Sequence, residues 1–186
     1  PRSTSPRAGG GSVVESRTAG DAPDIAAHGI IGDLRSAALV STDGTIDWFC
    51  PERFDRPSVF ASILDAERGG AWRLAPTGEV TRTQQYYLPD TAVLVTRFLT
   101  PDGVIEVQDF MPVLQAHDPD HQQRLVRRVA AVRGRVPIAT EIEVRHDYGA
   151  SAAEPVAVED GVHIPDGHAD LMLTSTHSLS IDEGTV

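Results

Sequence analysis

The sequence has little cysteine, few aromatic residues and a shortage of positive charge, and each shortage excludes a class of protein. One cysteine among 186 residues cannot form an internal disulfide. With 16 basic and 27 acidic residues the formal net charge is −11, which repels phosphate backbones and anionic lipids, so we expect no nucleic-acid or membrane partner. No stretch approaches the roughly 20 consecutive apolar residues of a membrane helix, and the N-terminus has no apolar signal-peptide core. We therefore expect a soluble, cytoplasmic protein.

The first 23 residues are almost free of apolar side chains. They are rich in Ser, Gly and Pro and include Gly9-Gly10-Gly11. Such a stretch buries too little surface to offset the entropy lost on ordering. We predict a disordered tail over residues 1–23, followed by one domain over residues 24–186.

Both ends of the sequence are typical of a piece of a longer protein. The chain starts at Pro1, and methionine occurs only at positions 111 and 172. Near the other end, the turn signal Asp182-Glu183-Gly184 precedes Thr185-Val186, which would begin a strand. We expect a processed chain or a fragment that is truncated within its last strand.

Turn signals between short β-branched segments predict an all-β protein. Three hairpins are expected, joining 36–40 to 45–50 through Asp43-Gly44, 91–100 to 104–110 through Pro101-Asp102-Gly103, and 156–158 to 162–164 through Glu159-Asp160-Gly161. Further strands are expected at 71–74, 81–87, 125–133, 138–144 and 169–175, and one short helix at 58–64. Because the strand over 91–100 is apolar on both faces, we predict an antiparallel β-sandwich with one short helix.

The second arm of the first hairpin carries a tryptophan and the cysteine. In an extended strand Ile46, Trp48 and Cys50 share one face, so Trp48 is expected to anchor the core. Cys50 is expected to be a small buried hydrophobe and not a reactive thiol. Pro51 has no N–H for a sheet ladder, so residues 51–57 must leave the sheet as a loop.

Ordered motifs around this arm resemble the opening of bacterial family 15 glycoside hydrolases, the group of glucoamylase-like and trehalase-like enzymes. The motifs are Ile31-Gly32-Asp33, Ser36 to Val40, Asp43 to Trp48 and Arg53 to Pro57. The resemblance continues through Tyr87-Leu88-Pro89, Thr91 to Arg97 and Asp109 to Val113, and covers the chain from about residue 26 onward. It implies an N-terminal β-sandwich domain that is normally followed by an (α/α)6 barrel, which holds the active site and is absent from this sequence.

The resemblance carries no catalytic residue onto this chain. In that family the acid and the base are two glutamates of the barrel, and a Trp-x-Arg-Asp stretch near the barrel's start helps to bind the sugar. Neither Trp48 nor Trp72 is followed by Arg-Asp at that spacing. The resemblance therefore implies a non-catalytic domain, inactive alone and without cofactor or metal. Its partners would be its own downstream (α/α)6 catalytic domain and the α-glucoside substrate of the full-length enzyme, either trehalose or an α-glucan.

The loop between Pro51 and Pro57 holds the candidate site residues. Arg53, Phe54 and Asp55 place a cation, an aromatic ring and an acid together, which suits a domain interface or a sugar-binding rim. The alternative is an internal clasp between Arg53 and Asp55 with Phe54 tucked into the core. On the first interpretation the loop is the edge of an apolar patch that packs on the catalytic barrel.

Other polar residues are expected to have structural roles. Asp33, Asp47 and Asp109 suit hydrogen bonds to nearby backbone. A proline between His117 and His121 argues against the helix that a metal site at that spacing needs, so a solvated loop is expected. A basic run is expected to split between strand faces and pair with outward Glu residues, and it comprises Arg124, Arg127, Arg128, Arg133 and Arg135.

A second hypothesis is a free-standing β-sandwich module that binds carbohydrate or protein. Sugar-binding sandwiches usually expose aromatic side chains for stacking on pyranose rings, whereas aromatic residues make up only 5% of this sequence and most lie in expected strands. We favour the first hypothesis. Counting the exposed Trp and Tyr side chains in the structure distinguishes the two.

Overall fold

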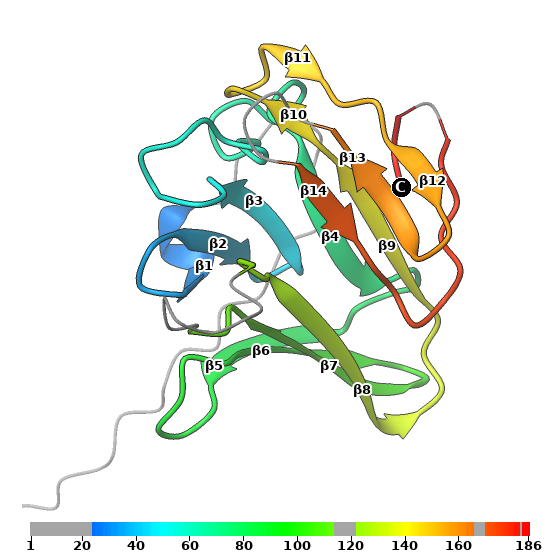
Figure 1. Cartoon of the computed structure of the whole chain (residues 1–186). Helices are drawn as coiled ribbons and strands as arrows, with labels where there is room; N and C mark the ends of the chain where they lie inside the picture. Colours follow the sequence, from blue (N-terminus) through cyan, green and yellow to red (C-terminus); the bar gives the residue numbers. More distant parts are fainter. Residues whose placement is uncertain (1–23, 114–121, 166–169, 183) are drawn as a thin grey trace, which may run out of the picture.

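The computed structural model describes residues 24–113, 122–165, 170–182 and 184–186. The expected tail over 1–23 and the loop with His117 and His121 lie outside these ranges. Nine strands form two main sheets (Figure 1): β1 (His28–Gly32), β2 (Ala37–Ser41), β3 (Thr45–Phe49), β4 (Ala71–Pro76), β5 (Arg82–Tyr87), β6 (Leu94–Thr100), β7 (Gly103–Phe110), β8 (Val126–Gly134) and β9 (Ile138–Glu143). Shorter elements are η1 (Ile25–Ala27), β10 (Arg145–His146), β11 (Ser151–Ala152), β12 (Val156–Val158), β13 (Gly161–Ile164) and β14 (Leu171–Leu173).

Two antiparallel sheets stack as the layers of the predicted sandwich. One has the strand order β1-β2-β3-β4-β9 and the other β5-β6-β7-β8. The four-stranded sheet lies below the five-stranded one in Figure 1. A third sheet, β12-β13-β14, packs on the upper layer, since Val162 and Ile164 share a buried cluster with Ile142 of β9. The all-β antiparallel fold class is confirmed, as are the three expected hairpins.

Apolar side chains from both layers form the core. Phe98 of β6 is buried in one cluster with Leu74 and Ala75 of β4, so the facing sheets interdigitate there. A larger cluster joins β1, β2 and β3 to Leu94 of β6. It also includes Phe60, which lies in the segment after the loop over residues 51–57.

The first hairpin ends in a bulge that breaks strict alternation. Gly44 has φ +86°, and a Cβ there would collide with the carbonyl oxygen of Leu74, so the turn requires glycine. Along β3, Ile46 pairs with Val40 and Trp48 pairs with Leu39, which leaves Asp47 as the extra residue of a β-bulge. Asp47 is consequently buried, as Ile46 is.

Trp48 is less buried than the expected core anchor. The Trp48 side chain is half-buried, and its ring lies 5.8 Å from that of Tyr148 with the planes 44° apart. Cys50 is fully buried, as expected, and burial raises the pKa of its thiol. A buried thiol with a raised pKa is a poor nucleophile.

No helix forms over residues 58–64, contrary to expectation. Phe60 instead makes a β-bridge with Phe49, whose amide donates to the Phe60 carbonyl oxygen at 3.0 Å. The Val59 amide donates to the Phe49 carbonyl oxygen at 2.9 Å. Pairing with β3 therefore takes the backbone groups that a helix would have used.

Candidate functional site

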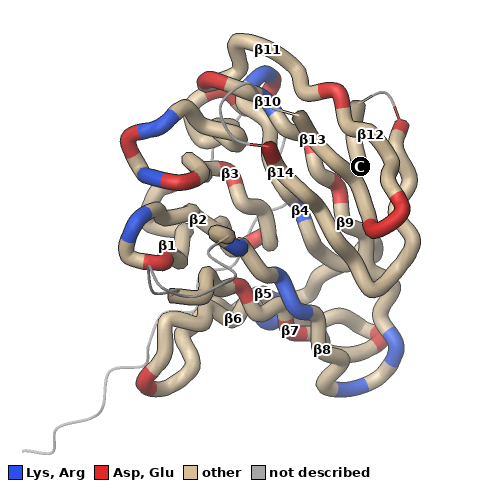
Figure 2. The backbone as a smooth tube through the Cα atoms, in the orientation of Figure 1, with Lys and Arg blue, Asp and Glu red and all other residues tan. Residues whose placement is uncertain are grey.

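Two loops lie side by side where β1 and β3 end. The first covers residues 33–36 and the second residues 51–57, and we name them the paired loops. The Phe54 amide of the second donates to the Arg35 carbonyl oxygen of the first at 3.3 Å. Figure 2 shows their charged residues clustered at the left edge of the molecule.

One glutamine, which lies just before β8, links the paired loops. Gln123 Nε2 donates to Asp33 Oδ2 at 2.8 Å, and Gln123 Oε1 accepts the Glu52 amide at 2.6 Å. As expected, Asp33 also accepts backbone hydrogen bonds, from the amides of Arg35 at 3.0 Å and Ser36 at 2.8 Å. Burial tends to raise the pKa of this carboxyl, but the hydrogen bonds from Gln123 and the two amides lower it below its ordinary value.

The second loop contains the Arg53–Asp55 clasp but leaves the aromatic ring outside. Arg53 Nε and Nη2 donate to Asp55 Oδ1 and Oδ2 at 2.9 and 3.1 Å. The hydrogen bond from Arg53 lowers the pKa of the Asp55 carboxyl. Phe54 is 70% exposed, so the alternative in which it is tucked into the core is wrong. An ion pair this exposed contributes little to stability. Its effect here is to hold the Arg53 and Asp55 side chains together on either side of Phe54.

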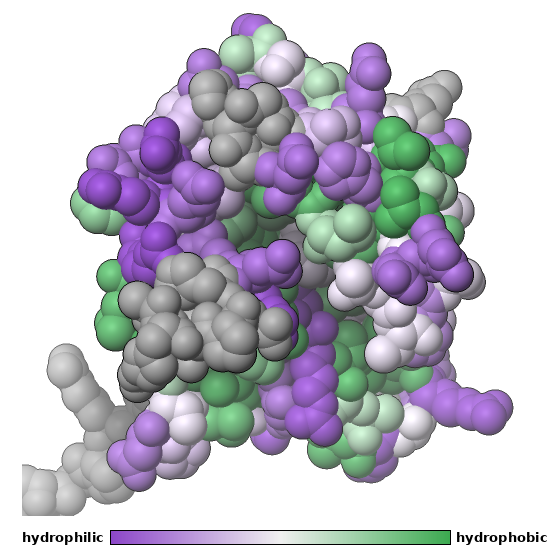
Figure 3. Space-filling model, viewed as in Figure 1, coloured by the Kyte–Doolittle hydropathy of each residue, from purple (hydrophilic) through white to green (hydrophobic). Residues whose placement is uncertain are grey.

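The paired loops hold strained backbone and display apolar side chains. Leu34 is 90% exposed and has φ +72°, and Glu52 has φ +63°. Left-handed backbone costs a residue other than glycine about 1 kcal/mol or more and persists only where the surroundings impose it. In Figure 3 green surface borders the purple charged surface at the left margin. Leu34 and Phe54 are thus exposed to solvent on loops whose backbone is held in place by its surroundings.

A buried arginine, paired with an aspartate of its own sheet, joins the two main sheets. Arg127 of β8 and Asp109 of β7 have side chains 1% and 0% exposed, with Nε and Nη2 donating to the carboxylate at 2.9 and 3.2 Å. The guanidinium also donates to the carbonyl oxygens of Trp72 and Gly44 in the facing sheet, each at 2.7 Å. It lies 5.3 Å from the Trp72 ring centroid, within cation–π range. The expectation of an outward ladder is therefore wrong for Arg127, which points into the core.

A second buried pair, between His28 and Asp47, could not be foreseen from the sequence pattern. His28 Nε2 lies 2.7 Å from Asp47 Oδ2, and His28 Nδ1 lies 3.0 Å from the Asp24 carbonyl oxygen. A carbonyl oxygen only accepts, so Nδ1 carries a hydrogen and the Nε2–Oδ2 contact needs a further proton. Asp47 thus binds a side chain where a backbone partner was expected. Burial raises the pKa of the Asp47 carboxyl, against the opposing hydrogen bond from His28.

Residues 17–182 of this chain match the family model described as trehalase-like, N-terminal. The chain belongs to that family. The trehalase of Mycolicibacterium smegmatis is 31% identical over 183 residues, covering 86% of this chain and 27% of the relative. The trehalase of Mycobacterium tuberculosis is 30% identical over 182 residues with the same shares, and that of Thermoplasma volcanium is 42% identical over 92 residues, covering 48% of this chain and 15% of the relative. No solved structure matches the chain.

The trehalase-like N-terminal domain therefore spans about a quarter of the length of its mycobacterial relatives, at 27% of each. Those relatives are larger proteins in which a domain of this kind is one part. Within the residues that the structure describes, no three His, Cys, Asp or Glu side chains gather as metal ligands. The same ranges contain no helix long and apolar enough to cross a bilayer.

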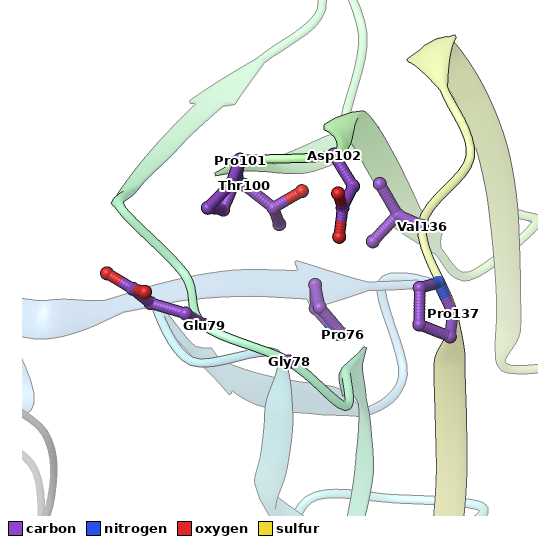
Figure 4. Close-up of a pocket in the computed structure, with 8 residues that line it drawn as sticks. All are labelled: Pro76, Gly78, Glu79, Thr100, Pro101, Asp102, Val136 and Pro137. Carbon is purple, nitrogen blue, oxygen red and sulfur yellow. The ribbon is translucent and has the colours of Figure 1, made fainter.

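The tryptophan and tyrosine side chains of the trehalase-like domain are engaged within the described part of the chain. Neither tryptophan is exposed, and the two partly exposed tyrosines have local partners. Tyr87 hydroxyl accepts the Ile30 amide at 2.9 Å and donates to the Ile30 carbonyl oxygen at 2.8 Å, and Tyr148 packs on Trp48. A small pocket has a volume of about 100 Å³, below the ~300 Å³ of ordinary ligand sites. Figure 4 shows its lining: Pro76, Gly78, Glu79, Thr100, Pro101, Asp102, Val136 and Pro137.

Proposed function

We propose that this chain is the non-catalytic β-sandwich domain, over residues 24–186, of a cytoplasmic family 15 glycoside hydrolase of the glucoamylase-like and trehalase-like group. Its paired loops would dock on a downstream catalytic domain, an (α/α)6 barrel. The observation that carries the proposal is the exposure of Phe54 and Leu34 on two loops that Gln123 and the Phe54–Arg35 backbone bond link together. A single buried thiol agrees with a reducing compartment.

Interface chemistry supports this use of the paired loops. Protein interfaces combine aromatic and aliphatic anchors with a charged rim. The paired loops carry both kinds of group, since Phe54 and Leu34 are exposed and the second loop also holds the ion pairs Arg53–Asp55 and Arg56–Glu52. Backbone already fixed before contact loses less entropy on docking. The strain at Leu34 and Glu52 is then the cost of presenting these side chains.

Trehalose is the substrate we propose for the full-length enzyme. All three relatives described above are trehalases by name, which favours trehalose over an α-glucan. Hydrolysis needs a carboxylic acid for the leaving oxygen and a carboxylate for the attacking water. We assign both to the catalytic domain and none to this chain, whose part is to support that domain.

The chain alone should therefore have no glycosidase activity. Purified chain incubated with trehalose, maltose and starch is expected to release no glucose above a buffer blank. Turnover that co-purifies with the chain through repeated chromatography would contradict the assignment of both carboxyl groups to another domain.

Alanine at Phe54 tests the docking surface in two proteins. In the 186-residue chain Phe54→Ala should leave the melting temperature unchanged, because the ring is exposed. In the full-length enzyme it should lower the melting temperature and trehalase activity, as loss of an interface anchor costs about 2 kcal/mol. Leu64→Ala is the matched control, since Leu64 is equally exposed but lies outside the paired loops.

Two outcomes would overturn the docking proposal. The first is a lower melting temperature of the short chain with Phe54→Ala, which would mean that the ring serves the fold. The second is a full-length enzyme that responds to Leu64→Ala and Phe54→Ala alike. Arg53→Ala in both proteins then tests whether the clasp orients Phe54, because the same substitution should weaken the full-length enzyme without affecting the short chain.

A further inference from the structure

The last residue of the chain is already part of a sheet edge. Val186 donates its amide to the Ile142 carbonyl oxygen at 3.0 Å and accepts the Ile142 amide at 2.9 Å. A reciprocal pair of this kind is one rung of an antiparallel ladder. The Val186 side chain is buried in the cluster that holds Ile142, Val162 and Ile164. Val186 is thus seated against β9 by both its backbone and its side chain.

The register shows which groups of β9 face outward. On its inner side β9 pairs with β4, where Trp72 lies opposite Ile142. Because Ile142 gives both backbone groups to Val186, alternation turns those of Thr140 and Ile138 to the same outer side. Pro76 of β4 lies opposite Ile138. Because proline has no N–H to donate to Ile138, this pairing agrees with the alternation. Among the described residues, these outer groups of Thr140 and Ile138 have no hydrogen-bond partner.

The opposite edge of the same sheet is capped at its central residue. Strand β1 is that edge, and the Tyr87 hydroxyl occupies both the amide and the carbonyl oxygen of Ile30. At β9 no comparable cap is present in the described ranges, and Ile138 is exposed there. Open edges with apolar side chains invite pairing with another strand, so natural proteins usually block or cover them.

We propose that the outer edge of β9 is the docking site of one extended segment, the residues that follow Val186 in the full-length protein. They would add a sixth strand to the five-stranded sheet, antiparallel to β9. The second residue after Val186 would lie opposite Thr140 and the fourth opposite Ile138. A segment tethered at Val186 acts at an effective concentration on the order of millimolar, which favours it over a separate molecule.

The inference rests on the proposed function in one respect, namely that the polypeptide continues into a second domain. It adds a specific connection to the one proposed at the paired loops. The trehalase-like domain would be joined to its partner through a shared sheet and not through a loose linker alone. The direction of the strand takes the chain toward Ile138, beside the pocket that Val136 and Pro137 help to line.

Hydrogen exchange at single amides tests the sixth strand. The amides of Thr140 and Ile138 are the probes, and those of Glu141 and Ala139, which face β4, are the internal control. In the 186-residue chain the outer amides should exchange about 100-fold faster than the inner ones. In the full-length enzyme the outer amides should slow by about the same factor, with the inner ones unchanged.

Two results of this measurement would contradict the sixth strand. Outer amides that exchange equally fast in both proteins would overturn the proposal. Outer amides already protected in the short chain, together with a dimer in sedimentation, would assign the edge to a second copy and also overturn it. The same measurement on the full-length Phe54→Ala variant separates this inference from the proposed function, because β9 should stay protected even where the paired loops no longer dock.

Discussion

Replacing Arg127 by methionine removes a cation that serves both sheets at once. Methionine keeps an apolar stem near the Trp72 ring but deletes the two bonds to Asp109 and the bonds to the carbonyl oxygens of Trp72 and Gly44. Asp109 would remain as a buried carboxylate without its cation, which costs about 3–5 kcal/mol. Losing the bonds to the two carbonyl oxygens adds about 1 kcal/mol or more, although the Gly44 carbonyl oxygen keeps its bond from the Leu74 amide at 3.1 Å. Against the roughly 5–15 kcal/mol of a typical domain, this is a severe loss.

A double substitution identifies the origin of the loss. In Arg127→Met with Asp109→Leu no unpaired charge is left, so the cost should fall to about 1–2 kcal/mol, chiefly from the lost bonds to the carbonyl oxygens of Trp72 and Gly44. The double variant should therefore be more stable than the single one. Arg128→Met is the matched control, because that neighbouring arginine is exposed and its contact with Gln108 is 3.5 Å long, and it should change stability by about 0.5 kcal/mol or less.

Urea unfolding followed by circular dichroism measures all three variants. The free energies of unfolding are compared at matched m-values, which shows that the unfolded states are alike. A cost below about 1 kcal/mol for Arg127→Met would refute the view that Arg127 joins the sheets. A double variant as unstable as the single one would show that the unpaired carboxylate is not the cause.

Two further predictions concern β3. Trp48→Ala should cost about 2 kcal/mol in urea unfolding, below the roughly 3–5 kcal/mol of a fully buried ring, whereas Trp48→Phe, which keeps a ring against Tyr148, should cost less than half as much. Asp47→Asn should change how stability depends on pH. Burial raises the pKa of the Asp47 carboxyl above its ordinary 3.8, so its contribution is fully present below that value and fades as the pH rises through the folded pKa. The parent should therefore lose stability relative to Asp47→Asn as the pH rises above the ordinary pKa of 3.8, and parallel profiles would contradict this.

The hairpins were predictable because their information is local. Asp43-Gly44 can adopt the positive φ that a tight turn needs, and Gly44 does so at +86°. The helix predicted at residues 58–64 is wrong for the opposite reason. The hydrogen bonds that fix this segment are made with Phe49, and the local sequence gives no sign of them. Strand β1 is missed for the same reason, because its five residues become a strand only by pairing with β2.

In the candidate site, too, local features could be predicted and long-range contacts could not. A cation and an acid two residues apart, Arg53 and Asp55, make a clasp one of the two alternatives that the sequence offers. The exposure of Phe54 could not be predicted, because Gln123, which fixes the paired loops, lies some 70 residues further along the chain. The pair of His28 and Asp47 likewise joins distant residues, and a lone histidine at the start of a strand carries no signal that would reveal its partner.

Burial of the lone thiol at Cys50 makes this protein a convenient carrier for chemical labels. A maleimide needs an accessible thiolate, and Cys50 offers neither access nor ready ionisation in the folded state. A cysteine introduced by Leu34→Cys or by Leu64→Cys would then be the one position that takes a fluorophore or a cross-linker, with no need to remove the native residue. Labels on the paired loops and on a remote surface can in this way be compared within one unaltered core.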